Sequence, residues 1–238
     1  MTWSRQGERT FWTDWGTAPR TVVVFGGSFD PPHRGHIELP LDAARAIGAD
    51  WVLYMPAAQS PHKDRAPGAS AEDRLGMLRA ALRGRSHCSV SDLELHRVGA
   101  GPSYTVDTLR ELRQAAPSSV TFRLLIGADQ ALALPRWREP GAIVELAEPL
   151  VMRRSHGASE VNLVDRLASL PAPVGAPASV WHRRVVNVPT VDVSSTQVRA
   201  LLRHGTDPGA RAALRKLVPS PVLQYIGARG LYRAVPGA

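Results

Sequence analysis

The 238-residue sequence has a single cysteine, only two lysines and no long apolar run. Cys88 cannot form a disulfide within the chain, which agrees with a reducing compartment. No apolar run approaches the ~18 residues of a membrane-spanning helix. The first 20 residues carry three tryptophans among polar and charged residues, not the apolar segment of a signal peptide. These absences predict a cytoplasmic protein with no membrane partner.

The charge balance is basic but its pattern is not that of a nucleic-acid tail. The net charge is +8, and of the 29 basic residues only Lys63 and Lys216 are lysine. No block of about five or six like charges is present. We therefore expect no nucleic-acid partner, and a positive field of this kind suits ligands that carry several phosphate groups.

The apolar pattern predicts an α/β fold with one parallel sheet. Hydrophobic residues make up 44% of the chain, enough for a sizeable core. Short apolar runs alternate with helical patterns, which is typical of parallel strands joined by helices. We assign residues 1–20 to an N-terminal extension and residues 21–238 to one domain with a C-terminal helical segment. The predicted strands are 21–24, 51–55, 88–95, 120–126, 149–152 and 185–188, and the main predicted helices are 37–47, 70–83, 103–115 and 194–203.

The stretch 25–36, FGGSFDPPHRGH, joins the first predicted strand to the first predicted helix. Gly26 and Gly27 lack a β-carbon, so we expect a sharp turn here and a close approach of phosphate to the backbone N–H groups. His33 and His36 are three residues apart and share one face of a first helical turn. The positive end of the helix points to the same place. The pattern predicts a phosphate site at the carboxyl end of the strand.

A second candidate anion site begins at Ser194, which precedes Gln197 by three residues as in a capping box. A well-capped helix without a ligand is the alternative interpretation. Ser195 and Thr196, with the first N–H groups of the helix, can hold an anion. Arg199 lies one turn further on and adds a forked positive charge.

Three other features carry candidate chemistry. Residues 102–109, PSYTVDTL, indicate a helix start with Ser103 as its cap. Asp129 follows a central strand, where a carboxylate suits a ribose hydroxyl, and Trp137 offers a flat face to an aromatic ring. Lys63 lies on the loop after the second strand, within reach of a phosphate. Taken alone, a core position for Trp137 and a solvated loop for Lys63 are the favoured interpretations.

Together these segments resemble a known family. Residues 28–36 resemble the (T/S)-F-D-P-x-H-x-G-H signature of the nucleotidyltransferase superfamily, whose H-x-G-H is related to the HIGH motif of class I aminoacyl-tRNA synthetases. Residues 193–199 are similar to its I-S-S-T-x-(I/V)-R pattern. Residues 102–109 match the P-S-Y-T-x-D-T-L segment of bacterial nicotinate mononucleotide adenylyltransferases. Further matches are S-P-x-K at 60–63, G-x-D followed by Trp at 127–137, and V-x-x-Y-I-x-x-x-x-L-Y at 222–232, where we expect packing residues.

The resemblance implies a Rossmann-like, doubly wound parallel sheet with C-terminal helices, and adenylyl transfer from ATP to nicotinate mononucleotide. The residues that it implies in catalysis are His36, His33, Arg199 and Lys63. Those implied in ATP binding are Gly26, Gly27, Ser28, Phe29, His33, His36, Gly127, Asp129, Ser194, Ser195, Thr196 and Arg199. Those implied in mononucleotide binding are Ser28, Phe29, Lys63, Tyr104, Thr105 and Trp137. Mg²⁺ is expected on the nucleotide, because the sequence has no carboxylate cluster with ligand spacing.

Two alternatives stay open at this point. One is a different adenylyltransferase of the superfamily, acting on nicotinamide mononucleotide or pantetheine phosphate. The other is a non-catalytic nucleotide- or RNA-binding protein, against which the complete set of histidines, arginine and capping serines argues. The sequence leaves the oligomeric state undecided.

Overall fold

The described part of the protein is built on one parallel β-sheet. The computed structural model describes residues 2–3, 20–58, 68–97, 103–154, 160–189, 191–204 and 207–233. Seven strands in these residues pair in the order β1-β4-β3-β2-β5-β6-β7, and all neighbouring pairs are parallel. Their bounds are Thr2–Trp3 (β1), Arg20–Gly27 (β2), Trp51–Pro56 (β3), Cys88–Ser91 (β4), Val120–Gly127 (β5), Glu148–Arg154 (β6) and Val185–Val188 (β7).

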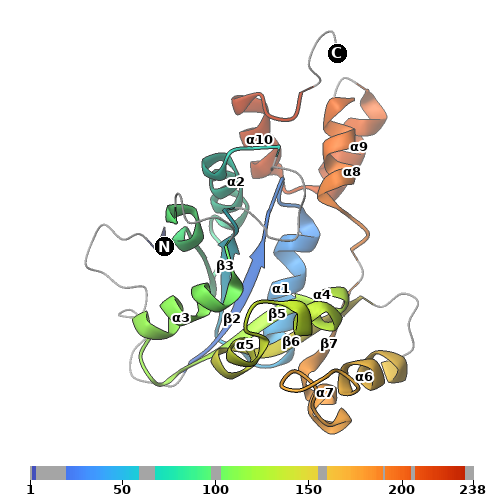
Figure 1. Ribbon diagram of the computed structural model, residues 1–238. Coiled ribbons are helices and arrows are strands. Elements are labelled where there is room, and N and C mark those ends of the chain that lie inside the picture. Colours follow the sequence, from blue (N-terminus) through green and yellow to red (C-terminus); the bar gives the residue numbers. More distant parts are fainter. Residues whose placement is uncertain are drawn as a thin grey trace.

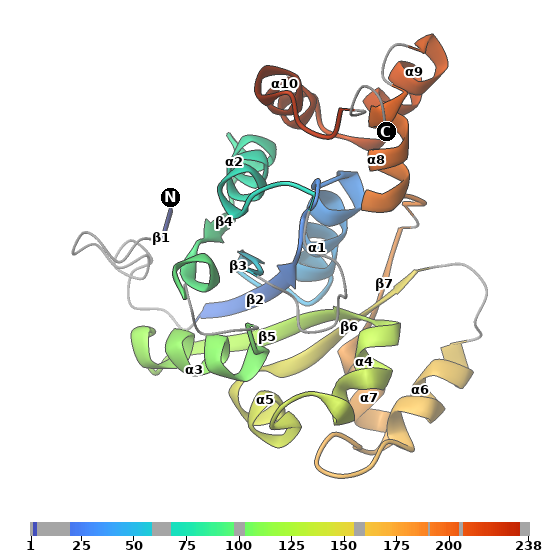
Figure 2. The ribbon, with the colours of Figure 1, turned by 45° about the horizontal axis from the view of Figure 1, so that its top comes forward.

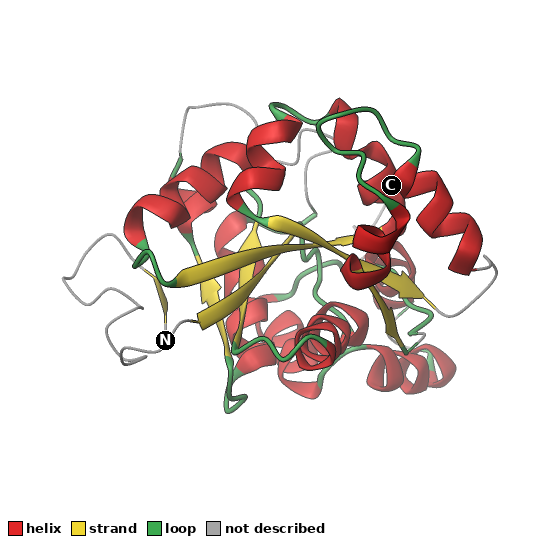
Figure 3. Ribbon diagram, turned by 90° about the horizontal axis from the view of Figure 1, so that it is seen from below, coloured by secondary structure: helices red, strands yellow, loops and turns green. Residues whose placement is uncertain are grey.

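Helices cover both faces of the sheet, as Figures 1 to 3 show. One face carries α1 (Arg34–Ala46), α2 (Ala71–Leu82), α8 (Ser195–Arg203), α9 (Pro208–Leu217) and α10 (Ser220–Arg229). The other face carries α3 (Thr105–Ala115), α4 (Ala128–Ala133), α5 (Pro140–Leu146), α6 (Glu160–Ala168) and α7 (Ala178–Arg184). The predicted doubly wound α/β class with C-terminal helices is confirmed. No helix in the described residues has the length and apolar character needed to cross a membrane.

Strand β2 shows how the two faces share one central strand. Val23 and Phe25 belong to the core beneath α1 and α2, whereas Val22 and Val24 belong to the core beneath α3. Successive side chains of a strand point to opposite faces, so a strand covered on both sides has to be apolar at every position. For this reason the continuous run at 21–24 predicts a central strand.

The strand order changes direction between β2 and β5. From β2 the chain adds β3 and then β4 on one side, and β5, β6 and β7 follow on the other side. In open parallel sheets a crevice forms outside the carboxyl ends of the strands at such a point. The stretch 25–36 runs directly from the end of β2 into α1, so its glycines and histidines lie at this crevice.

Three segments differ from the prediction. The predicted strand 88–95 ends at Ser91, and Leu93–His96 form a 3-10 turn. Residues 128–147, where the sequence pattern indicates no element, contain α4 and α5. Residues 155–183, predicted as mostly irregular with one short helix, contain α6 and all but the last residue of α7. Several of these helices have only six or seven residues, too few for a helical period to show.

Part of the N-terminal extension joins the sheet edge. Thr2 and Trp3 pair with Val90 and Ser91 of β4. Residues 4–19 lie outside the described residues. The division of the chain into residues 1–20 and 21–238 stays a prediction.

Gly76 allows α2 and α10 to pack closely. A β-carbon at Gly76 would lie 2.6 Å from Cζ of Tyr225. The Tyr225 hydroxyl donates a hydrogen bond to Oδ1 of Asp73 at 3.2 Å, so the ring cannot turn away without losing this bond. We expect Gly76→Ala to lower the free energy of unfolding by about 1–2 kcal/mol, because overpacking outweighs the ~1 kcal/mol gain in helix propensity.

The matched control is Gly227→Ala in α10, where an added β-carbon meets nothing within 4 Å. Only helix propensity changes at this position, so the free energy of unfolding of this variant should rise by about 0.5–1 kcal/mol. Urea unfolding of both variants measures the contrast. A Gly76→Ala midpoint at or above that of the unaltered chain would show that α10 shifts at no cost.

Candidate active site

A cavity of about 790 Å³ opens at the carboxyl ends of β2, β3, β5 and β6. It lies at the reversal point of the strand order, where this fold class binds its ligands. The predicted site residues that line it are Gly26, Gly27, Ser28, His36, Thr105, Gly127, Asp129 and Trp137. The fold therefore brings together residues from three of the predicted motifs in one crevice.

The turn after β2 is made by Phe29 and not by the two glycines. Gly26 and Gly27 belong to β2 and pair with Met55 and Pro56, so the predicted sharp turn at the glycines is wrong. Phe29 instead adopts a left-handed conformation with φ of +48°. A β-carbon at Gly27 would come within 3.1 Å of the Phe29 ring, so the glycine makes room for it. Because the Phe29 ring is buried, its predicted role in binding concerns its main chain.

His33 and His36 cap the first turn of α1 reciprocally. His33 Nδ1 accepts a hydrogen bond from the His36 N–H at 3.3 Å, and His36 Nδ1 accepts one from the His33 N–H at 3.4 Å. The two rings stack with centroids 3.6 Å apart. Since Nδ1 accepts in each ring, a neutral imidazole carries its proton on Nε2. His36 lines the cavity, whereas His33 is only 4% exposed and stacks against the His36 ring.

Gly35 allows the start of α8 to lie against the start of α1. A β-carbon at Gly35 would lie 3.2 Å from His33 Nδ1 and 3.3 Å from Cγ1 of Val193, which leads into α8. Ser195 strengthens the contact by donating from Oγ to the carbonyl oxygen of Pro31 at 2.9 Å. The two helix starts that the sequence predicts to share one ligand are therefore neighbours.

The start of α8 is capped as predicted and holds Arg199 against the loop before α1. Ser194 Oγ accepts from the N–H of Gln197 at 3.2 Å. Arg199 donates from Nη1 to the carbonyl oxygen of Asp30 at 2.6 Å and from Nη2 to Oγ1 of Thr196 at 3.2 Å. These α8 residues do not line the 790 Å³ cavity and connect to it through the loop 28–33.

Two predicted mononucleotide residues lie differently. Tyr104 does not line the cavity, and its ring lies 4.8 Å from the guanidinium of Arg138. Tyr104 also occupies the N-cap position of α3, so the predicted cap at Ser103 is wrong. Lys63 lies outside the described residues. The roles of Lys63 and Tyr104 stay predictions.

A buried polar cluster in the cavity wall was not indicated by the sequence. Thr108 Oγ1 donates to Oε1 of Glu94 at 2.6 Å and accepts from Nη1 of Arg97 at 3.0 Å. Burial raises the pKa of the Glu94 carboxyl, and the Thr108 hydrogen bond and the Arg97 charge oppose this shift. The 3-10 turn after β4 places Glu94 in this wall, so the strand prediction for 88–95 concealed it.

The cavity also has a basic and polar wall, made by Arg153 at the end of β6 and by Asn162 and Arg166 of α6. Arg153 is held by a hydrogen bond from Nε to Oδ1 of Asn187 at 2.8 Å. The sequence predicts a short helix in this region. Only the tertiary structure shows that Asn162 and Arg166 of this helix line the cavity.

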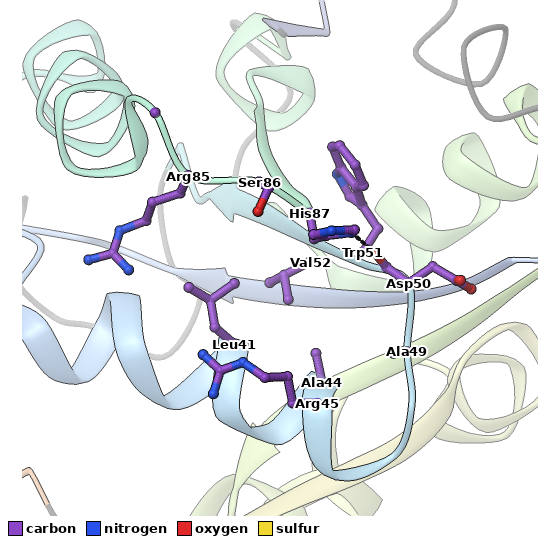
Figure 4. Close-up of a pocket in the computed structure, with 11 residues that line it drawn as sticks. Leu41, Ala44, Arg45, Ala49, Asp50, Trp51, Val52, Arg85, Ser86 and His87 are labelled. Atoms are coloured by element: carbon purple, nitrogen blue, oxygen red, sulfur yellow. Dashed lines mark hydrogen bonds between the residues drawn. The ribbon is translucent and has the colours of Figure 1, made fainter.

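A second hollow, of about 530 Å³, lies at the opposite edge of the sheet (Figure 4). It is lined by the end of α1, the start of β3 and the turn between α2 and β4, including Arg45, Arg85 and His87. His87 Nδ1 lies 3.3 Å from the carbonyl oxygen of Asp50. Because this hollow is at the amino ends of the strands and contains none of the predicted site residues, it is not the candidate active site.

The fold and the site define a class of protein. A doubly wound parallel sheet whose first helix begins at the reversal point of the strand order is a Rossmann-like nucleotide-binding arrangement. A cytidylyltransferase-like family model matches residues 24–201. The chain is 38% identical to a probable nicotinate-nucleotide adenylyltransferase of Pseudomonas syringae pv. tomato, over 92% of this chain and 96% of that protein. A relative of the same name from Gloeobacter violaceus is 36% identical, over 90% and 97%.

Solved structures agree on the fold. Plasmodium falciparum nicotinic acid mononucleotide adenylyltransferase complexed with NaAD superimposes with a TM-score of 0.66 at 18% identity, over 90% of this chain and 97% of that chain. The same protein complexed with APC gives a TM-score of 0.65. The chain belongs to the cytidylyltransferase-like family and, within it, to the nicotinate-nucleotide adenylyltransferases. The family, the fold and the enzyme class inferred from the motifs are thereby confirmed.

Proposed function

We propose that this enzyme joins ATP to nicotinate mononucleotide, giving nicotinate adenine dinucleotide and pyrophosphate in the biosynthesis of NAD. Its family makes it a nucleotidyltransferase of this pathway. The observation that carries the assignment of residues is the contact between the starts of α1 and α8 beside the cavity. One triphosphate can reach both helix starts, while the cavity has room for the two nucleosides.

The reaction needs no nucleophile from the protein. A phosphate oxygen of the mononucleotide attacks the α-phosphorus of ATP, and the bond from that phosphorus to the bridging oxygen of the β-phosphate breaks. The electron pair leaves with pyrophosphate. Because the attacking phosphate is already ionised, the protein contributes by positioning the reactants and by stabilising charge.

His36 and His33 form the charge-stabilising pair at α1. In the neutral imidazole of His36 the proton lies on Nε2, which donates to an oxygen of the ATP phosphates as negative charge shifts toward the leaving group. His33 fixes the His36 ring by stacking and by the reciprocal cap. The positive end of α1 favours the same charge.

At α8, Arg199 together with Ser194, Ser195 and Thr196 holds the β- and γ-phosphates. The guanidinium already contacts Thr196 Oγ1 and the Asp30 carbonyl, so it is oriented before ATP binds. The main chain of residues 26–29, with Gly127 and Asp129, lies along the nucleosides. Lys63 adds positive charge near the reacting phosphates.

Nucleotidyltransferases generally use a divalent metal ion, and we propose Mg²⁺. Within the described residues, no group of three or more His, Cys, Asp or Glu side chains could hold a metal. We propose that the ion would enter on the triphosphate and would, when bound, neutralise charge on the phosphate oxygens. The protein's own part is the histidine pair and the arginine.

In this proposal Thr105 and Trp137, which both line the cavity, receive the pyridine ring of the mononucleotide. Thr105 and Thr108 belong to the first turn of α3, so the positive end of this helix faces the ring. A carboxylate at a helix start gains about 0.3–1 kcal/mol, and up to about 2 kcal/mol when partly buried, whereas a neutral amide does not. The acid form of the mononucleotide is therefore the preferred acceptor.

Pyrophosphate release from ATP with a panel of acceptors tests the function. We expect kcat/KM for nicotinate mononucleotide to exceed that for nicotinamide mononucleotide by about two- to thirtyfold, the ratio that this range of energies gives. A preference for the amide, or for pantetheine phosphate, would move the enzyme to another branch of the superfamily. RNA binding with a steep salt dependence, without pyrophosphate release, would support a non-catalytic protein.

A further inference from the structure

The Asp30 carboxylate collects contacts from three distant parts of the chain. Oδ2 accepts from the N–H of Gly68 at 2.7 Å, and Oδ1 accepts from the N–H of Ala69 at 3.1 Å and from the hydroxyl of Tyr232 at 2.7 Å. Oδ2 also lies 3.7 Å from Nη1 of Arg199. Asp30 is only 7% exposed, so water cannot readily replace these partners.

The two N–H groups and the hydroxyl that donate to the Asp30 carboxylate are neutral, and they hold it at a distance from the Arg199 guanidinium. A direct hydrogen bond between a guanidinium and a carboxylate measures about 2.7–2.9 Å, and the 3.7 Å separation is clearly longer. The Arg199 Nη1 instead donates to the main-chain carbonyl oxygen of Asp30 at 2.6 Å. The carboxylate therefore orients the guanidinium by its charge without forming the close ion pair that would compete with a phosphate.

The C-terminal segment is shaped to deliver the Tyr232 hydroxyl to this place. After α10 the chain reverses at Gly230, with φ of +62°, and the Leu231 N–H donates to the carbonyl oxygen of Ile226 at 3.1 Å. The ring then lies against Gly68, where a β-carbon would be 3.3 Å from Cε1 of Tyr232. Burial and the hydrogen bond to Asp30 raise the pKa of Tyr232 far above its usual value, so the hydroxyl keeps its proton.

We propose that Tyr232 is a positioning residue for Arg199, acting through the Asp30 carboxylate, and that it tunes the affinity of the enzyme for ATP. This inference rests on the proposed function, in which Arg199 holds the terminal phosphates. Without the hydroxyl, Oδ1 keeps only the Ala69 N–H, and the carboxylate turns toward Arg199 and pairs with it directly. ATP then has to break this ion pair to bind. The expectation that Tyr232 serves packing alone is therefore incomplete.

The test is Tyr232→Phe, which keeps the ring and removes only the hydroxyl. We expect the dissociation constant for ATP, measured by calorimetry without acceptor, to rise about three- to tenfold, while that for nicotinate mononucleotide stays unchanged. Tyr225→Phe is the matched control, because it removes a hydroxyl that donates to a different carboxylate, Asp73, from the same C-terminal region. This control should leave both constants unchanged.

A double-mutant cycle identifies the route of the effect. If Tyr232 acts through Arg199, the loss of ATP affinity caused by Tyr232→Phe should largely disappear in an Arg199→Lys background. Full additivity of the two changes would overturn the proposal. So would an unchanged ATP affinity in Tyr232→Phe, or equal losses for ATP and mononucleotide, which a purely structural role would give.

The same measurements separate this inference from the proposed function. Acceptor identity comes from pyrophosphate release, whereas the positioning role is read from ATP binding alone. A chain that binds ATP and shows the Tyr232 effect but uses another acceptor would retain the inference and lose the proposed substrate. Absence of ATP binding by the unaltered chain would overturn both.

Discussion

Replacing His36 by alanine is expected to lower kcat by about two to four orders of magnitude. The change removes an imidazole that lines the cavity and that, in the proposed mechanism, donates from Nε2 where charge develops in the transition state. It also removes half of the reciprocal cap of α1, which costs stability of about 0.5–2 kcal/mol. Steady-state pyrophosphate release at saturating substrates measures the loss in kcat.

Two further variants separate the chemistry of His36 from its capping role. Asparagine at position 36 retains an acceptor for the His33 N–H, so His36→Asn should recover stability but little activity. His204→Ala changes an exposed histidine at the end of α8 and should leave kcat unchanged. Near-normal turnover in the folded His36→Ala enzyme would refute the assigned role.

The second large effect is expected at Arg74, a buried arginine of α2 with 1% exposure. Its Nη1 donates to the carbonyl oxygens of Ser28 at 2.9 Å and Ala57 at 2.7 Å, and Nη2 donates to that of Ala58 at 3.1 Å. One side chain thus holds the loops after β2 and β3 together beside the cavity. The positive charge of Arg74 also attracts the negative charge of the Asp30 carboxylate.

Arg74→Met keeps much of the side-chain volume but leaves three carbonyl groups without these donors. These three groups are partly buried, so each costs about 1–1.5 kcal/mol, the lower part of the range for an unsatisfied buried group, and we expect a loss of about 3–5 kcal/mol in the free energy of unfolding. The Ser28 loop should also loosen, lowering kcat/KM for both substrates. Chemical denaturation and steady-state kinetics measure the two effects.

The matched control is Arg79→Ala, also on α2. This arginine is exposed and contacts the buried Asp92 with Nη2 at 3.3 Å, and His96 Nε2 stays 3.5 Å from the same carboxylate oxygen. Its removal should therefore cost about 1 kcal/mol, well below the loss expected for Arg74→Met. If Arg74→Met unfolds at the same denaturant concentration as Arg79→Ala, the bridging role of Arg74 is wrong.

The sequence alone determined the local chemistry. The run at 21–24 predicts a strand because an element buried on both sides must be apolar at every position. The cap at Ser194 follows from the distance between a side-chain oxygen and an N–H three residues later. The proposed phosphate-binding residues at the starts of α1 and α8 could be predicted for the same reason, because within each motif they lie close together in the sequence.

The tertiary structure alone decided which of these local features meet. Tyr232 and Asp30 are 202 residues apart, and only the reversal after α10 and the position of that helix on α2 bring them together. Glu94 enters the cavity wall because the chain leaves β4 in a 3-10 turn, not as a strand. Gly35 matters because Val193 packs on it. Contacts of this kind depend on strand order and helix placement, which are set by the packing of the whole core and leave no periodic signal in the residues that make them.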